Sequence, residues 1–209
     1  MSDMTLFEFD KEIRKEHALI CGCDEAGRGP LAGDVYAAAV IFDEDTVIEG
    51  INDSKKLTEK KREELFDEIT EKAKAYAICT ASVAEIEKIN ILNCAMLAMK
   101  RAVEALSVRP ELALIDGNKA PELDGVKTKT VVKGDAKSQS VAAASILAKV
   151  ARDRYMKEMD KKYPEYQFAK HKGYGTKLHY QMIDLYGESP IHRPSFLAKY
   201  YAKKAEGGK

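Results

Sequence analysis

The chain has 209 residues, which is enough to bury a core without disulfides or a structural metal, and its composition is that of a globular protein. Basic and acidic side chains number 34 each, so a formal net charge of zero excludes a protein that is basic as a whole. The charge is unevenly distributed, because residues 1–116 hold 15 basic and 24 acidic residues whereas residues 117–209 hold 19 and 10. Such asymmetry is typical of proteins that contact nucleic acids or membranes, although solvated faces divided by chance would look the same.

Membrane-spanning and secretory segments are not expected. The longest apolar run, residues 36–42, is far shorter than the roughly 20 residues of a membrane helix, and the first residues lack the apolar region of a signal peptide. The cysteines show no zinc-ligand spacing and are predicted to be reduced core thiols of a cytoplasmic protein. They are Cys21, Cys23, Cys79 and Cys94.

Hydrophobic periodicity predicts an α/β protein with a mixed central sheet flanked by helices on both faces. Strands are expected over residues 17–23, 35–42, 76–83, 112–115 and 127–132, the first two forming a hairpin across a glycine-rich turn. Helices are expected over residues 58–75 with Thr58 as N-cap, 90–106, 138–161 and 176–186. Small residues on one face of the helix over 138–161 predict close packing against the sheet.

Domain organisation is expected to be simple. We predict an N-terminal extension over residues 1–16, one domain over 17–197 that includes a small C-terminal helical part, and a tail over 198–209. The last residues of that tail, 203–209, are expected to be frayed.

Acidic side chains stand at the ends of three predicted elements. Asp24 and Glu25 end the first strand, and they can converge only if the strand ends or bends there, because neighbouring strand residues point to opposite faces. Asp116 ends an apolar strand, where it could be no more than a turn residue. Asp135 lies where the long helix opens and could be only a helix cap. Asp153 lies about four turns along that helix between two arginines, so a structural ion pair is the better interpretation there.

Carboxylates without a neighbouring cluster of histidine or cysteine suit Mg²⁺ or Mn²⁺ rather than zinc. Two such ions about 4 Å apart are a common apparatus for hydrolysis at phosphorus. One ion lowers the pKa of the attacking water, and the other stabilises the leaving oxygen. The acidic positions therefore indicate metal-dependent phosphoryl chemistry.

Three loops could contact a sugar–phosphate backbone. The glycine-rich loop (residues 27–33) offers bare backbone amides, and Arg28 adds a phosphate-binding fork. It lacks the Lys and Ser/Thr of a P-loop, which argues against an ATP-dependent enzyme. Residues 52–56 could bind phosphate or could be a solvated loop. Tyr174 lies between two glycines and is predicted to be exposed, where it could stack on a sugar or base.

The segment DEAGRGPLAG over residues 24–33 resembles the N-terminal signature of ribonuclease HII. Asp34 follows it where the family usually has Pro, which puts the local loop geometry in question. The resemblance continues in order over about residues 17–197, and the short segment before the first strand leaves no room for the extra N-terminal domain of ribonuclease HIII. Its further motifs are DSKKL at 53–57, IDG at 115–117, KGD at 133–135, AAASILAKV at 142–150, RDR at 152–154, HKGYGT at 171–176 and SPIHR at 189–193.

This resemblance implies an RNase H-like fold and a monomeric endonuclease that depends on Mn²⁺ or Mg²⁺. The implied activity is hydrolysis of the RNA strand of RNA–DNA hybrids, and of single ribonucleotides embedded in duplex DNA, to 3′-hydroxyl and 5′-phosphate ends. A non-catalytic hybrid-binding module is the alternative, although all four implied ligands are present.

The implied roles transfer residue by residue. The catalytic and metal-binding set is Asp24, Glu25, Asp116 and Asp135. The glycine-rich loop would contact the ribose 2′-hydroxyl, and Tyr174 would stack on the neighbouring deoxyribose. The implied substrate-binding set is Gly27, Arg28, Gly29, Ser54, Lys55, Lys56 and Tyr174.

Overall fold

A computed structural model describes residues 4–207 and shows a five-stranded sheet in the order β3-β2-β1-β4-β5. The strands are β1 (Ile20–Ala26), β2 (Val35–Ile41), β3 (Ala75–Ala81), β4 (Leu112–Asp116) and β5 (Lys127–Val131). β1, β2 and β3 pair antiparallel in turn, whereas β4 runs parallel to β1 and β5 runs parallel to β4. The predicted mixed sheet and the predicted hairpin of the first two strands are both confirmed.

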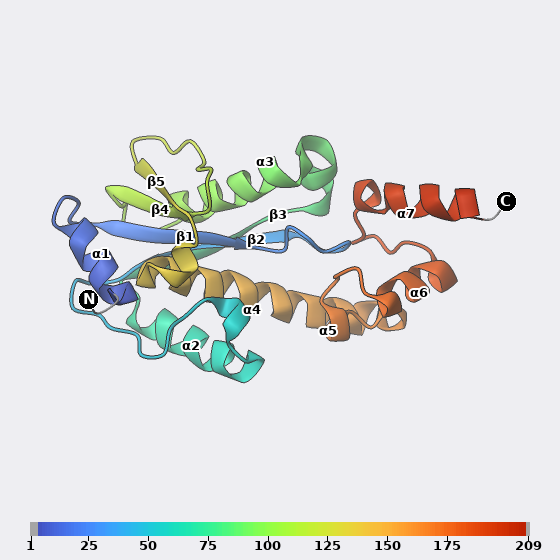
Figure 1. Cartoon of the computed structure of the whole chain (residues 1–209), viewed down its shortest axis with the longest axis horizontal. Helices are drawn as coiled ribbons and strands as arrows, with labels where there is room; N and C mark the ends of the chain where they lie inside the picture. Colours follow the sequence, from blue (N-terminus) through green and yellow to red (C-terminus); the bar gives the residue numbers. More distant parts are fainter. Residues whose placement is uncertain (1–3, 208–209) are drawn as a thin grey trace.

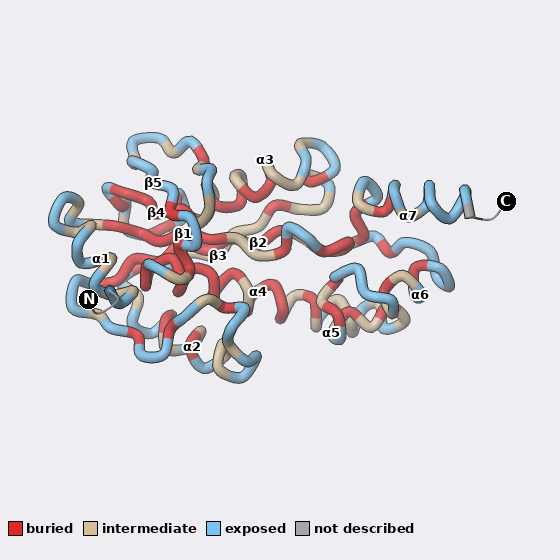
Figure 2. The backbone as a smooth tube through the Cα atoms, in the orientation of Figure 1, coloured by how far each residue is buried: buried red, intermediate tan, exposed pale blue. Residues whose placement is uncertain are grey.

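Helices cover both faces of this sheet (Figure 1). They are α1 (Leu6–Arg14), α2 (Glu59–Lys72), α3 (Val83–Glu104), α4 (Gln139–Lys162), α5 (Phe168–His171), α6 (Lys177–Tyr186) and α7 (Pro194–Gly207), with 3₁₀ turns η1 (Ser54–Lys56), η2 (Gly134–Ala136) and η3 (Pro164–Tyr166). α3 packs on one face, α4 and α2 pack on the other, and the buried backbone concentrates between these layers (Figure 2). α5, α6 and α7 extend beyond the sheet, as the predicted C-terminal helical part.

α4 lies unusually close to β1. A Cβ atom at Gly22 would lie 2.1 Å from the carbonyl carbon of Ser140 and 2.2 Å from the nitrogen of Val141, so only glycine fits there. The adjoining face of α4 is made of fully buried alanines, which keep the helix near the sheet. Close packing through small residues is therefore confirmed.

The N-terminal extension contains a helix that periodicity did not reveal. Thr5 and Glu8 form a capping box at the start of α1, in which each side chain accepts a hydrogen bond from the other residue's backbone N–H. Asp10 of α1 is buried, and its Oδ2 accepts hydrogen bonds from the N–H of Ser140 at 2.8 Å and the hydroxyl of Ser140 at 2.7 Å. α1 is thereby fastened to the first turn of α4.

The predicted helix over 90–106 begins earlier than expected, at Val83. Asn90 has φ 67° and ψ 164°, which interrupts the helical backbone in the middle of α3. Its Oδ1 accepts hydrogen bonds from the N–H groups of Leu92 and Asn93, so Asn90 caps the second half of the helix. The sequence prediction had identified that second half alone.

The C-terminal residues differ from expectation. α7 continues to Gly207, so residues 203–207 are helical rather than frayed, and residues 208–209 lie outside the described part of the chain. The predicted boundary between residues 197 and 198 falls inside α7, and the division into domains stays a prediction. Within residues 4–207 no helix is both long and apolar enough to cross a membrane. None of the four cysteines forms a disulfide.

Candidate active site

Two carboxylates lie side by side at the point where β4 ends beside β1. Cys23 and Ile115 are partners in the parallel register, so Asp24 and Asp116, one residue further along, lie at the same edge of the sheet. Asp24 is only 5% exposed. Burial raises the pKa of Asp24 well above its usual value, and the negative charges of Glu25 and Asp116 raise it further. This edge of the sheet therefore gathers negative charge in a buried place.

β1 does not end at Asp24 as the sequence suggested. It continues through Ala26, and Glu25 pairs with Ala37 of β2, so both acidic residues are inside the strand. β4 has already ended at that point, which leaves one side of β1 open. Asp24 and Glu25 both border a hollow on that side. The N–H of Glu25 donates to Asp24 Oδ1 at 2.7 Å, and Arg28 Nη1 lies 3.1 Å from Glu25 Oε1.

Asp135 approaches Asp116 through the turn before α4. The N–H of Gly134 donates to Asp116 Oδ1 at 2.6 Å, which fixes η2 against the end of β4. Asp135 in that turn is buried, and burial together with the charges of Asp116 and Asp53 raises its pKa. Lys55 Nζ lies 3.8 Å from Asp135 Oδ2 and provides a nearby positive charge.

A cleft of about 470 Å³ opens beside these carboxylates. Most of the predicted site residues border it, namely Asp24, Glu25, Gly27, Arg28, Gly29, Ser54, Lys55 and Tyr174. Asp116, Asp135 and Lys56 do not border it. Asp116 is connected to the cleft through its place beside Asp24 in the sheet, and Asp135 through the turn that Gly134 fixes to Asp116, whereas nothing in the structure ties Lys56 to it.

Tyr174 is 45% exposed, as the two flanking glycines predicted. Its ring lies over α4, with Lys149 Nζ 6.0 Å and Arg152 Cζ 5.8 Å from the ring centroid. A Cβ atom at Gly29 would lie 3.7 Å from Cε1 of the ring. The glycine-rich loop and the tyrosine loop (residues 173–175) therefore form adjoining walls of the cleft.

Five residues that border this cleft lie outside the predicted site: Ala26, Ile91, Ser145, Lys149 and Phe196. Ser145 Oγ lies 2.9 Å from Ser54 Oγ, which ties η1 to α4. Ser145 and Lys149 are one turn apart on a helix face otherwise rich in alanine. That spacing of polar residues among small ones was the signal available in the sequence.

Two other acidic residues are structural. Asp153 is paired with Lys149 Nζ at 2.8 Å and with Arg62 Nη2 at 3.7 Å, which confirms the ion-pair interpretation. Asp34 Oδ1 accepts the N–H of Val83 at 3.0 Å at the start of α3. Asp34 therefore has a defined anchoring contact in place of the proline that was expected there.

The donor chemistry of the site fits a hard divalent cation. All four predicted ligands are carboxylates. Burial, and after it the repulsion from neighbouring carboxylates, raises the pKa values of Asp24 and Asp135, and a positive charge between the carboxylates would offset both effects. Among residues 4–207, however, no three carboxylate, imidazole or thiol groups are gathered as a complete ligand set. Which of these residues bind metal stays a prediction.

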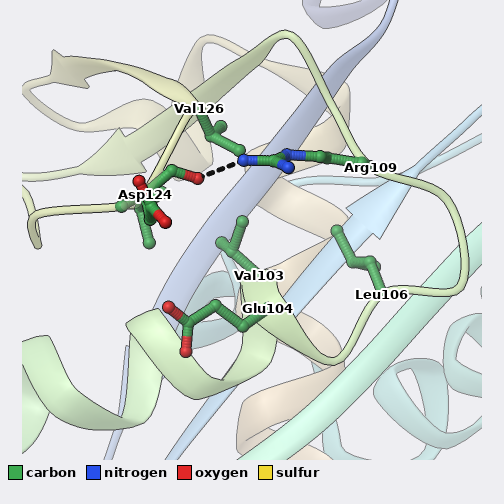
Figure 3. Close-up of a pocket in the computed structure, with 7 residues that line it drawn as sticks. Val103, Glu104, Leu106, Arg109, Asp124 and Val126 are labelled. Atoms are coloured by element: carbon green, nitrogen blue, oxygen red, sulfur yellow. Dashed lines mark hydrogen bonds between the residues drawn. The ribbon is translucent and has the colours of Figure 1, made fainter.

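A second hollow, of about 280 Å³, lies between the end of α3 and the segment before β5 (Figure 3). Across it the guanidinium of Arg109 donates a hydrogen bond to the backbone carbonyl of Asp124. None of the predicted site residues lines this hollow. It is lined by Val103, Glu104, Leu106, Arg109, Leu123, Asp124 and Val126.

Residues 21–199 match the family model for ribonuclease HII. The chain belongs to the ribonuclease HII family. It is 53% identical over 196 residues to the ribonuclease HII of Caldicellulosiruptor bescii, covering 93% of this chain and 95% of that protein. It is 58% identical over 178 residues to that of Idiomarina loihiensis, covering 85% of this chain and 95% of that protein.

The fold agrees with that assignment. The crystal structure of ribonuclease H2 from Pyrococcus horikoshii OT3 superposes with a TM-score of 0.71 at 28% identity, covering 85% of this chain and 93% of that one. The family resemblance and the RNase H-like fold predicted from the sequence are thus confirmed. The chain is an RNase H type 2 endoribonuclease, a metal-dependent hydrolase.

Proposed function

We propose that this ribonuclease HII hydrolyses the RNA strand of RNA–DNA hybrids and cuts at single ribonucleotides embedded in duplex DNA, leaving 3′-hydroxyl and 5′-phosphate ends. One observation carries the proposal. Asp24 and Glu25 border the same cleft as the glycine-rich loop and Tyr174. A phosphodiester held by those two loops would therefore lie beside the carboxylates.

Discrimination between RNA and DNA would come from the glycine-rich loop. The 2′-hydroxyl is the only difference between the two sugars, so a protein needs groups that can approach it closely. Gly29 has no side chain between its backbone and the cleft, and Arg28 lies against Glu25, so sugar recognition and the acidic cluster adjoin. Ser54 and Lys55 border the same cleft, where Lys55 could meet a phosphate.

Asp24, Glu25, Asp116 and Asp135 would hold Mn²⁺ or Mg²⁺. The bound ions would activate water and stabilise the leaving oxygen. The chain's own contribution is to hold the carboxylates in position: β1 and β4 place Asp24 beside Asp116, and η2 brings Asp135 to Asp116. The monomeric state and cytoplasmic location expected from the sequence stay predictions, to be checked by sedimentation and cell fractionation.

The decisive test is cleavage of an end-labelled DNA duplex that contains one ribonucleotide, with an all-DNA duplex as control. We expect a single cut at the ribonucleotide with Mn²⁺ or Mg²⁺ and none with EDTA. Asp24→Asn should abolish the cut while hybrid binding is largely kept, because the fold and both loops remain. Undiminished cleavage by Asp24→Asn, or cutting of the all-DNA control at the wild-type rate, would refute the proposal.

Tyr174 provides a second arm of the same test. We expect Tyr174→Ala to lose cleavage at the ribonucleotide–deoxyribonucleotide junction more than it loses binding, because the ring would no longer stack beside the cut. Tyr174→Phe keeps the ring and is the matched control. Equal kinetics for Tyr174→Ala and the wild type on the junction substrate would contradict this role.

A further inference from the structure

Three histidines are buried beneath the tyrosine loop. His171 ends α5, His179 lies in α6, and His192 lies in the turn before α7. His179 is fully buried, and His192 is 2% exposed. The rings of His171 and His179 stack with centroids 4.2 Å apart, and Nε2 of His179 lies 3.0 Å from Nε2 of His192. None of these side chains borders the cleft, and the proposed chemistry does not use them.

His192 and His179 form a hydrogen-bonded pair, and the backbone groups at the two ends of this pair fix which nitrogen of each ring carries the proton. The N–H of Ser189 can only donate, so Nδ1 of His192, 2.8 Å away, must accept. The hydroxyl of Ser189, whose oxygen also lies 2.8 Å from Nδ1, then donates to the same nitrogen. A neutral His192 then carries its proton on Nε2 and donates it to Nε2 of His179. His179 must in turn carry its proton on Nδ1, which lies 3.0 Å from the carbonyl oxygen of Tyr174. The result is a hydrogen-bond relay in one direction, from Ser189 through His192 and His179 to Tyr174.

The same rule fixes His171. The N–H of Gly173 donates to Nδ1 of His171 at 3.2 Å, so the proton of His171 is on Nε2, which lies 2.9 Å from the carbonyl oxygen of Tyr166. Every ring nitrogen of the three histidines is thereby used. The accepting nitrogens already receive protons from N–H donors, so the cluster has no free lone pair for a metal.

Burial favours the neutral form of all three imidazoles. Burial lowers the pKa of His179 and of His192 to about 4 and also lowers the pKa of His171. A second proton on His179 would lie on Nε2 and face the Nε2–H of His192 across 3.0 Å, whereas one on His192 would lie on Nδ1 and face the N–H of Ser189 across 2.8 Å. The relay therefore requires both rings to be neutral.

The relay ends on the backbone that carries the proposed stacking ring. The carbonyl of Tyr174 accepts from His179 and also from the N–H of Thr176 at 2.8 Å, so both of its lone pairs are used. The carbonyl of Gly173 accepts the N–H of Leu31 at 2.8 Å, which joins the tyrosine loop to the glycine-rich loop. These contacts leave the backbone of the tyrosine loop little freedom.

The other end of the relay is fixed to the glycine-rich loop. The carbonyl of Ile191 accepts the N–H of Gly33 at 2.8 Å. The guanidinium of Arg193, next to His192, donates to the carbonyls of Gly27 at 2.7 Å and Pro30 at 2.8 Å. The segment that starts the relay therefore also shapes the loop that would read the ribose.

We propose that His179 and His192 are positioning residues for cleavage at RNA–DNA junctions, and that their relay sets the place of Tyr174 relative to the glycine-rich loop. The inference rests on the proposed function, in which Tyr174 stacks beside the cut. The relay acts on the backbone of Tyr174 and does not touch the carboxylates. Its loss should change how the junction is held and leave metal binding unchanged.

Amide substitutions test the direction of the relay, because the amide nitrogen of Asn can replace Nδ1 of histidine and that of Gln can replace Nε2. His179→Asn keeps the donor to Tyr174, whereas His179→Gln loses it. At His192 the roles of the two amides are exchanged, because His192→Gln keeps the donor to His179 and His192→Asn loses it. A residue that serves only to fill the core would not give this crossed pattern.

The measurement is kcat/KM on the duplex with one embedded ribonucleotide, with the Mn²⁺ concentration for half-maximal activity and the Tm of each variant alongside. We expect kcat/KM to be about tenfold lower for His179→Gln than for His179→Asn, and about tenfold lower for His192→Asn than for His192→Gln. The half-maximal Mn²⁺ concentration should stay at the wild-type value. In a Tyr174→Ala background the difference between His179→Gln and His179→Asn should disappear.

Equal kcat/KM within each pair, or the same difference in the Tyr174→Ala background, would overturn the proposal. The wild-type protein gives an independent test by imidazole ¹⁵N NMR at neutral pH, which needs no variant to fold. We expect His192 protonated on Nε2 and His179 on Nδ1, and the opposite tautomers would refute the relay. If the wild type fails to cut the embedded ribonucleotide, the proposed function fails, and the NMR result still decides whether the relay exists.

Discussion

Gly22 of β1 is the position where one added methyl group should do most damage. The Cβ of an alanine there would lie 2.1 Å, 2.2 Å and 2.4 Å from the carbonyl carbon of Ser140, the nitrogen of Val141 and the carbonyl oxygen of Ser140. All three are backbone atoms, so no side chain can rotate out of the way. Ser140 is also held by Asp10 of α1 through two hydrogen bonds.

The size of the effect follows from this geometry. Ordinary contact for a Cβ atom begins near 3.4 Å, so Gly22→Ala must separate β1 from α4 by more than an ångström. A gap of about 0.5–1 Å already loses a quarter to a half of the dispersion attraction across an interface. Overpacking typically lowers the free energy of unfolding by about 1–3 kcal/mol. Because the added methyl group is attached to the backbone of β1 and meets the backbone of α4, we expect a loss of about 3 kcal/mol or more for Gly22→Ala.

Urea unfolding followed by circular dichroism measures this cost. Gly29→Ala is the matched control, because the nearest atom to its Cβ is Cε1 of Tyr174 at an ordinary 3.7 Å. Ser140→Gly in the Gly22→Ala background should not restore stability, because the clash is with backbone atoms. A Gly22→Ala protein within about 1 kcal/mol of the wild type would refute the reasoning, as would rescue by Ser140→Gly.

Three further outcomes are expected. Asp24→Asn should raise the Tm of the metal-free protein at neutral pH, because a carboxyl whose pKa is raised in the folded state opposes folding at pH values where it ionises. In the same thermal melts, Mn²⁺ should raise the Tm of the wild type and not that of this variant. Gly29→Ala should keep its wild-type Tm but cut the embedded ribonucleotide more slowly, since its methyl group would narrow the cleft beside Tyr174. The contribution of His179 and His192 to stability should be complete above about pH 6.5 and be lost as pH falls towards about 4, because the unfolded chain takes up their protons first. Urea titrations of the wild type and His192→Gln across that range should show a smaller loss of stability for the variant.

Part of the candidate site could be predicted because acidic residues directly follow apolar runs in the sequence. Asp24 and Asp116 each come directly after an apolar run in the sequence, and parallel pairing of those runs brings the two residues to one edge, so their meeting could be expected from the sequence. Tyr174 between two glycines was predicted to be exposed for an equally local reason, and it is. In these cases the residue types and their spacing were sufficient.

Other features depend on contacts far apart in the chain. α1 is amphipathic over only nine residues and is fixed by the buried pairing of Asp10 with Ser140, 130 positions away. The interruption of α3 at Asn90 needs a positive φ that periodicity cannot reveal. The histidine relay joins His179 to His192 and Tyr174 through backbone groups, so no spacing in the sequence predicts it.

The charge asymmetry between the two halves of the chain has a different meaning in the folded protein. Arg152 and Arg193 add to the positive count of residues 117–209, but both are fully buried and can meet no phosphate. Arg193 instead donates to backbone carbonyls of the glycine-rich loop, so its charge shapes the recognition surface from inside.

The cations that border the cleft are Arg28, Lys55 and Lys149, and two of the three come from the acidic half of the chain. Positive charge reaches the cleft because folding brings η1, the glycine-rich loop and α4 together. The uneven count along the sequence therefore does not locate the binding surface. Neutralising Lys55 or Arg28 should reduce the salt dependence of hybrid binding as much as neutralising Lys149 does.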